Sequence, residues 1–410
     1  MITKNKTINY VILLLTTYFC LIITDYALKK YWIYTSTYNK EVKPIIEHRN
    51  IENDNLRSEA LIEGYEPVIQ PNFWFDKNPE LLEITKKFNL VPLTGKPYTK
   101  VYLCNEGYGL IKYTTDRFGL RNPDYIWDKE IDVMLVGDSF ANGACVEEKF
   151  SISGGLRENY NAASLASNGN QPSQYNALIQ VFSKYFLPKK AYVLILYVND
   201  FEDDEKILNK ENKFIKENYV QKNLDYFDIE SIVNDKPEML SKEIINLLDL
   251  ASPIILKSAR SQLNHETLKK NSYFFRGIKV LKKHYNLPEY RKLLPFNKTK
   301  KSTLSNNIKL TLKNIKKYCG LHSLSNKECK PIVIFIPNSK YWKPGFNTEY
   351  HREAISKFVS KSKVNMFFYD STEDLKALGN KAYSPVGGHL SIEGYQIITK
   401  RIKLIIEKNE

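Results

Sequence analysis

The sequence predicts an α/β fold: a parallel β-sheet covered by helices on both faces. Four short, largely apolar runs at 131–136, 192–198, 332–336 and 365–369 show no alternation with polar residues. Such runs are typical of strands that are buried on both faces. Helical stretches lie between them, and this succession of strands and helices is typical of parallel sheets. The composition allows an ordered core, because 43% of the 410 residues are hydrophobic and 26% are charged.

The remaining elements have weaker signals. Residues 160–164 predict a fifth strand, and the clearest helices are predicted at 175–186 and 392–408. Gly137 follows the first apolar run and Pro337 follows the third, and both residue types commonly mark the end of a strand.

The beginning of the chain predicts a membrane anchor. Residues 8–24 carry no charge and are almost all apolar. This segment of 17 residues is at the short end of the length range of a membrane-spanning helix. We expect an anchor at 8–26 after a short cytoplasmic tail at 1–7. No small-residue cleavage site follows, and Phe19 before Cys20 is too large for a lipoprotein signal. Lysines flank both ends, so charge does not decide the orientation. We expect the large domain on the extracytoplasmic side, in a periplasm or at the cell surface.

Beyond the anchor we expect two regions. Residues 27–128 form an N-terminal extracytoplasmic region with strand-like pieces at 65–69 and 100–104. Residues 129–410 form the α/β domain, which a large helical and basic insertion interrupts at 205–330.

The cysteines are compatible with an oxidising compartment. Cys319 and Cys329 enclose a short loop and have a spacing compatible with a local disulfide. Cys104 and Cys145 are the other available pair, and buried free thiols are the alternative for all four. The sequence contains no C-x-x-C or His/Cys cluster typical of a structural zinc site. We expect no metal and no cofactor.

The net charge of +14 implies an anionic partner such as nucleic acid, an acidic glycan or a membrane surface. Residues 251–320 hold 17 Lys or Arg and two acids, a net charge of +15, so the other 340 residues sum to about −1. No nucleic-acid-binding motif accompanies this charge. We therefore expect a glycan or anionic lipid rather than nucleic acid, with a solvated basic face as the alternative.

Polar residues follow the predicted strands, where ligands bind in open parallel sheets. Ser139 lies in the turn after the first strand, Gly169 follows the weak strand, and Asn199 follows the strand at 192–198. His389 precedes the last helix and is a suitable general base for the Ser139 hydroxyl. The Gly169 N–H and the Asn199 amide are suitable donors to an oxyanion. Each motif alone is common loop material, but the four together predict a catalytic site.

These blocks resemble the GDSL-like, or SGNH, hydrolase superfamily, which is named for its Ser, Gly, Asn and His. The first block matches Gly137-Asp138-Ser139, the second Gly169, the third Asn199-Asp200 and the fifth His389. The likeness covers roughly 129–204 and 331–410, and the TDRFGLRN segment looks like the lead-in of many envelope-associated members.

The resemblance implies a flavodoxin-like three-layer α/β/α fold and metal-free ester chemistry. By it, Ser139 is the nucleophile and His389 is the base. The oxyanion hole is then formed by the backbone N–H groups of Ser139 and Gly169 together with the amide of Asn199.

The chain departs from the family pattern in two places. The family usually has Asp three residues before the His, where this chain has Val386. We expect either a Ser–His dyad or an orienting acid from the preceding strand end, where Asp370 and Asp374 are the candidates. The third block usually opens with Gly, and Tyr197 stands there.

The expected function is that of a membrane-anchored serine esterase or acyltransferase. It acts on ester groups, O-acetyl foremost, of an envelope polysaccharide through an acyl-enzyme. The alternative is a catalytically inactive SGNH-fold protein that binds glycan or acts as a scaffold in envelope assembly. A lipid-directed esterase is a third option. Hydrolase and transferase use the same residues, so the sequence does not separate them.

Overall fold

The computed structural model of the protein describes residues 43–75, 78–201, 226–228, 239–269, 304–323, 329–338, 349–361 and 366–408, with isolated positions before 28. The chain forms two compact units. One comprises Arg57–Ser258 and Lys300–Glu410, and the other comprises Met1–Leu56 and Ala259–Thr299. The first of these units holds both sheets and the candidate site.

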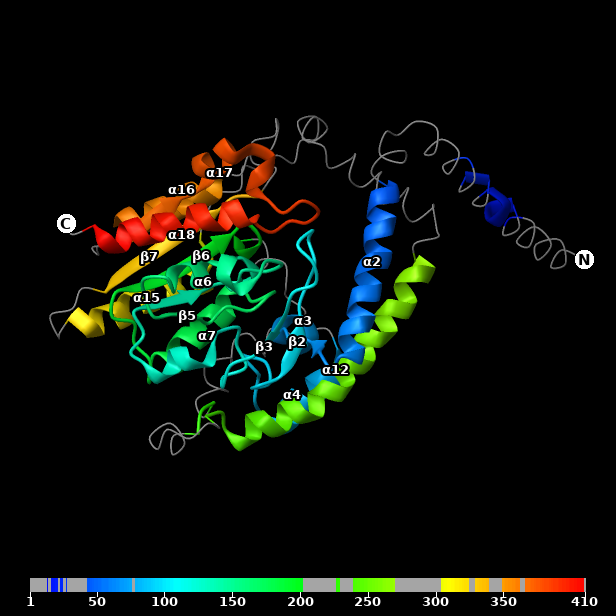
Figure 1. The fold of residues 1–410 in the computed structure, drawn as a ribbon, viewed down its shortest axis with the longest axis horizontal. Coiled ribbons are helices and arrows are strands. Elements are labelled where there is room, and N and C mark those ends of the chain that lie inside the picture. Colours follow the sequence, from blue (N-terminus) through cyan, green and yellow to red (C-terminus); the bar gives the residue numbers. More distant parts are fainter. Residues whose placement is uncertain are drawn as a thin grey trace, which may run out of the picture. The chain divides into compact units, whose positions relative to one another are not determined.

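The predicted α/β fold is confirmed, with a five-stranded parallel sheet at its centre (Figure 1). The strands are β4 (Val133–Val136), β5 (Ala162–Ser164), β6 (Ala191–Tyr197), β7 (Lys330–Ile336) and β8 (Phe367–Asp370). They lie in the order β5-β4-β6-β7-β8, and every neighbouring pair is parallel. The order reverses between β4 and β6, which makes that point the topological switch, where such sheets bind ligands.

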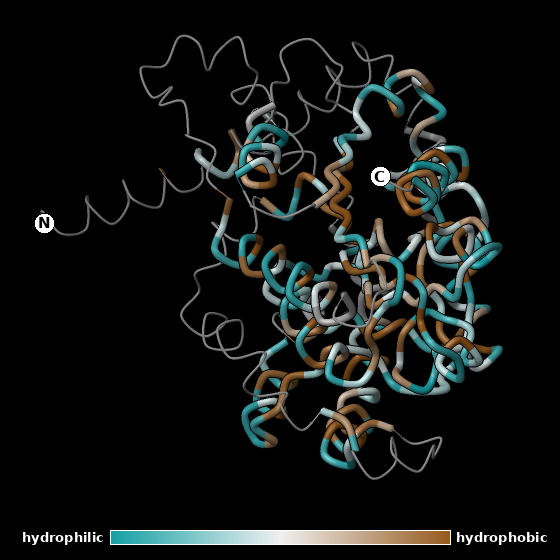
Figure 2. The backbone as a smooth tube through the Cα atoms, turned by 90° about the vertical axis from the view of Figure 1, so that its left-hand side faces the viewer, coloured by the Kyte–Doolittle hydropathy of each residue, from teal (hydrophilic) through white to brown (hydrophobic). Residues whose placement is uncertain are grey.

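The central strands are buried on both faces, as their unbroken apolar runs predict. All four residues of β4 and all seven of β7 are buried, and in β6 only the last residue, Tyr197, is partly exposed. Figure 2 shows hydrophobic segments of the described backbone interspersed with hydrophilic ones.

Helices cover both faces of this sheet. On one face α7 packs against α15, and on the other α6 packs against α18, an arrangement compatible with three α/β/α layers. The helices of this domain are α5 (Ser139–Asn142), α6 (Ile152–Leu156), α7 (Pro172–Phe182), α15 (Asn306–Ser323), α16 (Glu349–Lys361), α17 (Thr372–Leu378) and α18 (Ile392–Glu407). Short 3₁₀ turns lie at Asp124–Asp128, Glu148–Phe150 and Gly379–Ala382.

The predicted limits of two segments need correction. The helix expected at 175–186 is α7, which begins earlier because Pro172 occupies its first turn and Gln171 caps it. The insertion expected at 205–330 ends sooner, because α15 lies within those limits and belongs to the sheet domain. Neighbouring parallel strands need a crossover connection, and α15 immediately precedes β7 on the way from β6. The Thr311 hydroxyl of α15 donates to the carbonyl of Pro172 at 3.2 Å.

A second sheet of three short strands belongs to the same compact unit. Its strands are β1 (Glu66–Pro67), β2 (Lys100–Tyr102) and β3 (Lys112–Thr114), and β2 pairs with β3 in antiparallel register. The helices α3 (Pro71–Phe75) and α4 (Pro79–Phe88) lie between β1 and β2 along the chain. The boundary expected at 128/129 therefore does not divide the two sheets between compact units.

Both cysteine pairs form disulfides, so the alternative of four free thiols is wrong. Cys319 bonds Cys329 with Cα atoms 5.0 Å apart, which ties the end of α15 to the start of β7. Cys104 bonds Cys145 with Cα atoms 5.1 Å apart.

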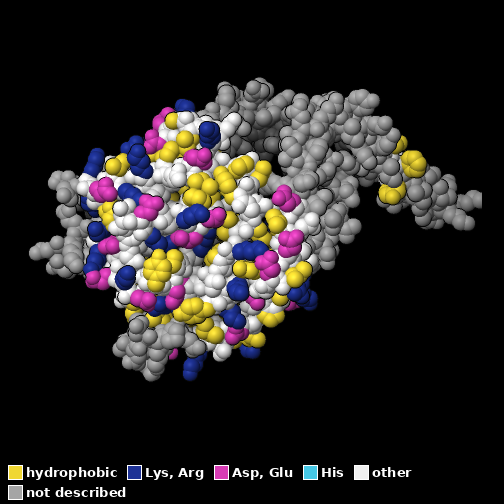
Figure 3. All heavy atoms as spheres, viewed as in Figure 1, with side chains coloured by type: hydrophobic (Ala, Val, Ile, Leu, Met, Phe, Trp, Pro, Cys, Tyr) yellow, Lys and Arg dark blue, Asp and Glu magenta, His cyan; other side chains and the backbone are white. Residues whose placement is uncertain are grey.

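Two other predictions concern segments that are only partly described. No helix among the described residues has both the length and the apolar character needed to cross a membrane. Most of the expected anchor at 8–26 lies outside those residues, as does the part of the basic stretch from 270 to 303. The long helices α2 (Lys43–Ile62) and α12 (Lys242–Lys269) each contribute to both compact units. Over the described part of the face in Figure 3, basic and acidic side chains are interspersed.

Candidate active site

Ser139 is the first residue of α5, and only Gly137 and Asp138 separate it from the carboxyl end of β4. The Asp138 side chain caps this helix by accepting the Phe140 N–H at 3.0 Å. A Cβ at Gly137 would lie 2.7 Å from the Ala141 Cβ and 2.9 Å from the Ile195 carbonyl oxygen. Glycine therefore lets the helix start this close to β6, which places the Ser139 hydroxyl at the sheet edge.

The structure brings His389 onto Ser139, as predicted. The His389 Nε2 atom lies 2.9 Å from the Ser139 Oγ atom. A bridge between Tyr383 and Leu390, and the bond from the Ser384 N–H to the His389 carbonyl at 2.9 Å, hold the loop before α18. The His389 side chain is 24% exposed and Ser139 is 9% exposed, so the pair is reachable without being fully hydrated.

Glu106 orients the imidazole, and the sequence analysis did not predict this. Its Oε1 atom lies 2.9 Å from the His389 Nδ1 atom, on the ring side opposite the hydroxyl. Glu106 belongs to the loop between β2 and β3, some 280 residues before His389. It lies two residues after Cys104, so a disulfide between Cys104 and Cys145 was the signal that could have located it.

The surroundings of Glu106 favour its ionised form. Burial acts to raise its pKa, but hydrogen bonds from His389 and Ser384 outweigh burial and lower the pKa to about 2. The carboxylate also accepts the backbone N–H groups of Gly388 at 3.2 Å and His389 at 3.1 Å. A carboxylate only accepts hydrogen bonds, so Nδ1 carries the proton and Nε2 is left to accept the Ser139 O–H.

The two acids expected to orient the imidazole have other partners, so that prediction is wrong. Asp370 accepts the Thr372 N–H at 3.0 Å and pairs with the Nε atom of Arg352 at 2.9 Å. Asp374 accepts the Tyr369 hydroxyl and pairs with the Nε atom of Arg401 at 3.0 Å. Position 386 needs no acid, because the loop from the second sheet supplies one.

Asn199 and Gly169 follow two other strands at the same edge of the sheet. The Asn199 Nδ2 atom donates to Asp138 beside Ser139, at 3.2 Å. Burial raises the pKa of Asp138, against the effect of that bond and of the Phe140 N–H. Gly169 is exposed in a left-handed turn (φ 76°) after β5, which neighbours β4 in the sheet.

Tyr197, which stands where the SGNH pattern has Gly, packs beside the helix that begins at Ser139. Its ring stacks on Phe140 with centroids 4.0 Å apart, and the Phe140 ring in turn lies 5.3 Å from that of His389. Burial raises the pKa of Tyr197 to about 12, so its hydroxyl stays protonated near neutrality. This departure adds aromatic surface beside the site.

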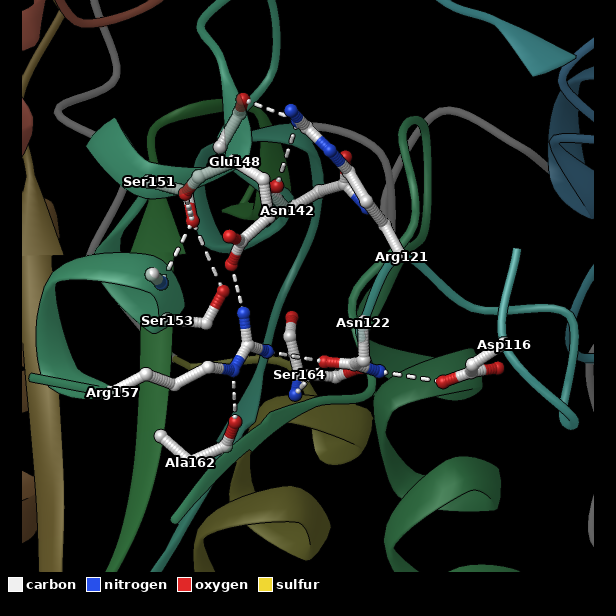
Figure 4. A network of polar contacts seen from close by, with 12 residues as sticks. Asp116, Arg121, Asn122, Asn142, Glu148, Ser151, Ser153, Arg157, Ala162 and Ser164 are labelled. Carbon is white, nitrogen blue, oxygen red and sulfur yellow. Dashed lines mark hydrogen bonds and ion pairs between the residues drawn. The ribbon is translucent and has the colours of Figure 1, made fainter. Parts of the chain in front are cut away.

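The TDRFGLRN segment fixes the chain around α5 through a buried polar network (Figure 4). The guanidinium of Arg121 donates to the carbonyls of Gly143 at 2.8 Å and Val146 at 2.7 Å. Asn122 donates to Asp116 at 2.9 Å and accepts the N–H of Ser164 on β5 at 2.8 Å. These bonds couple the segment to both β5 and the turn after Ser139.

One group of potential metal ligands lies in this site. Ligand atoms of Glu106, Cys145 and His389 all lie within 4.8 Å of one another. Carboxylate, thiolate and imidazole together suit zinc, but the Cys145 sulfur is bonded to Cys104. The trio therefore offers a metal two ligands rather than three while the disulfide persists.

The absence of a side chain at Gly387 makes room for Glu106. A Cβ at Gly387 would lie 1.7 Å from the Glu106 carboxyl carbon, whereas a Cβ at Gly388 would meet nothing within 4 Å. If the chain has the ester chemistry that the SGNH resemblance implies, we expect Gly387→Ala to displace the carboxylate and to lower kcat for an ester substrate by about 100-fold. Gly388→Ala retains its N–H and should have a much smaller effect. Equal kinetics for the two variants would contradict the placement of Glu106.

Comparison with protein-family models gives no match, and comparison with curated proteins gives none either. Sequence motifs and the geometry of the site are therefore the support for a function.

Proposed function

We propose that the chain is an SGNH-type serine esterase or O-acyltransferase in which Ser139, His389 and Glu106 act as a catalytic triad. The observation that carries the proposal is a continuous chain of two contacts, from Ser139 Oγ to His389 Nε2 and from His389 Nδ1 to Glu106 Oε1, each 2.9 Å. Nucleophile, base and orienting acid in this sequence of contacts are the parts that activate a serine.

The strand order supports an SGNH-type fold. Numbered along the chain within the parallel sheet, the order is 2-1-3-4-5, which is that of flavodoxin-like folds. Ser139 follows the first of these strands and Asn199 the third, so the two residues flank the switch point. The position of the site in the fold therefore agrees with the chemistry proposed for it.

The proposed reaction proceeds in two displacements. The Ser139 oxygen attacks the carbonyl carbon of the ester while Nε2 of His389 takes the hydroxyl proton, and Glu106 stabilises the imidazolium that results. When the tetrahedral intermediate collapses, Nε2 returns the proton to the leaving alkoxide and an acyl-serine remains. Water or a sugar hydroxyl, deprotonated by Nε2, then attacks this ester and releases Ser139.

The charge of the tetrahedral intermediate needs donors at the sheet edge. We assign them to the backbone N–H groups of Ser139 and Gly169 and to the amide of Asn199. An amide NH₂ carries two hydrogens, and one of those on Asn199 already binds Asp138. The bond to Asp138 orients the Asn199 amide, and the second hydrogen of its NH₂ group can then donate to an oxyanion.

An ester-bearing glycan of the cell envelope is the proposed substrate, with O-acetyl the foremost acyl group. The apolar N-terminal segment supports a membrane-anchored protein, and the two disulfides support an extracytoplasmic compartment. The excess of basic residues in 251–320 supports an anionic polymer as acceptor or donor. The inactive alternative depended on Val386, and Glu106 removes that reason for preferring it.

Labelling by a serine-directed organophosphonate tests the proposal. We expect the purified chain to react with the probe and to hydrolyse a small acetyl ester. Adding an O-deacetylated polysaccharide separates the two chemistries, since a transferase consumes the ester faster and acetylates the glycan. The absence of both labelling and turnover would leave a binding or scaffold protein.

A further inference from the structure

A disulfide joins the two segments that carry Glu106 and Ser139. Cys104 lies two residues before Glu106, and Cys145 lies six residues after Ser139. The bond therefore ties the β2–β3 loop of the second sheet to the chain that leaves α5 of the parallel sheet. The disulfide thus joins covalently the segment that carries the orienting acid and the segment that carries the nucleophile.

The same disulfide lies against the imidazole. The Cys145 Sγ atom is 3.7 Å from Nδ1 of His389, the nitrogen that Glu106 contacts at 2.9 Å. Cys145 is 1% exposed, so its sulfur packs beside the hydrogen bond between acid and base in a largely dry environment. Breaking the disulfide would therefore first affect the contact between Glu106 and His389.

The Cys145 end of the disulfide is fixed by the core. Cys145 has a φ of 63°, in the left-handed region that residues with side chains seldom adopt. Arg121 binds the carbonyls of Gly143 and Val146 on either side of it, and this guanidinium is itself buried. Cys145 is therefore a rigid point to which the other end is attached.

The Cys104 end lies on a loop that is half-buried or exposed. The Asn105 side chain accepts the N–H groups of Gly107 at 2.9 Å and Gly109 at 3.1 Å, so these bonds shape the loop from within. Hydrogen bonds of Glu106 itself join the loop to the segment around His389. The disulfide adds an attachment that does not depend on those hydrogen bonds.

We propose, on the premise of the triad chemistry above, that the Cys104–Cys145 disulfide is a positioning element that holds Glu106 on Nδ1 of His389. A dithiol reduces it by supplying two electrons and two protons, which yields two thiols and leaves the dithiol as its own disulfide. The Glu106 loop then loses its covalent attachment to the rigid side of the site. A displacement of about 1 Å at a catalytic group costs up to about 100-fold in rate, so reduction should lower kcat by about 10- to 100-fold.

Proton NMR of the full chain with ¹⁵N-labelled histidine reports the contact directly. The chain has six histidines, and His389→Gln assigns the signal in question. An Nδ1 proton held by a carboxylate resonates far downfield. We expect this resonance in the oxidised protein, its loss after reduction and its return after reoxidation. Reduction is carried out in EDTA, because a freed Cys145 thiol would complete the three-ligand group with Glu106 and His389.

The second disulfide provides a matched control. The paired variant Cys319→Ser/Cys329→Ser removes a bridge between α15 and β7, and it should keep both the resonance and its sensitivity to reductant. The paired variant Cys104→Ser/Cys145→Ser should lack the resonance in either buffer. Because folded wild type is reduced and reoxidised in the same tube, the test does not depend on either variant folding well.

The outcomes separate this inference from the proposed function. If both resonance and kcat survive complete reduction, or if oxidised wild type lacks the resonance, the disulfide does not position Glu106. If the resonance responds to reduction but the oxidised protein turns over no ester, the positioning stands and the esterase proposal fails.

Discussion

Ser139→Ala should abolish organophosphonate labelling and lower ester turnover by about 10⁴- to 10⁶-fold. The Ser139 oxygen is the atom that lies 2.9 Å from Nε2 of His389, and its removal leaves the base without a nucleophile to activate. Binding of a glycan ligand should persist, because the substitution removes one oxygen from a side chain that is 9% exposed. Turnover is measured as acetate released from a small acetyl ester.

Ser360→Ala is the control for this substitution. Ser360 is exposed near the end of α16, and its hydroxyl bonds the carbonyl of Lys357 within the same helix. The control should label and turn over like wild type. Retained labelling in Ser139→Ala would assign the probe to another residue and remove the basis of the enzyme proposal, provided that thermal melting shows both variants folded.

The sequence best predicts the strands whose residues form an unbroken apolar run, because such a run is typical of a buried strand. The run at 192–198 is apolar and β-branched without alternation, and it forms β6 between two parallel neighbours. Strand ends are where ligands bind in that topology, so Ser139 and Asn199 could be named as candidate site residues from the sequence. By contrast, the residues of β3 (Lys112–Thr114) are partly or fully exposed. This strand therefore has no apolar run by which the sequence could predict it.

The orienting acid could not be found by the same reasoning. Periodicity and strand ends locate residues within the parallel sheet, whereas Glu106 reaches the site from a loop of another sheet. Asp370 and Asp374 are closer to His389 in sequence, but neighbouring cations and hydroxyls bind them more locally. Sequence separation is a poor guide to contact where two sheets meet. The Cys104–Cys145 pair was the long-range constraint available, and the sequence analysis left its state open.

Glu106→Gln should lower kcat by about 10³- to 10⁴-fold while changing KM little. The glutamine fits the same space, but its NH₂ group can present a donor to Nδ1 of His389, which favours the wrong tautomer and removes the charge that stabilises the imidazolium. Glu106, with a pKa of about 2, should stay ionised across the pH range of an ester assay.

Asp370→Asn and Asp374→Asn are the matched controls, since they remove the same charge from the two acids expected earlier. Both should keep kcat within about twofold of wild type, because their partners are Arg352 and Arg401 rather than the imidazole. A large loss in Asp370→Asn or Asp374→Asn, with Glu106→Gln unaffected, would reverse the assignment of the orienting acid.

The free energy of unfolding gives a second measurement for the Glu106→Gln variant. The pKa of Glu106 falls from 4.5 to about 2 in the folded chain, so its ionised form stabilises the fold at pH above 4.5, and this contribution is lost as the pH falls towards 2. The free energy of unfolding of wild type should therefore exceed that of Glu106→Gln by more at pH 6 than at pH 3. Denaturant titrations at the two pH values measure this difference. A gap that is constant with pH would show that Glu106 is not held as a carboxylate by its hydrogen bonds to Ser384 and His389.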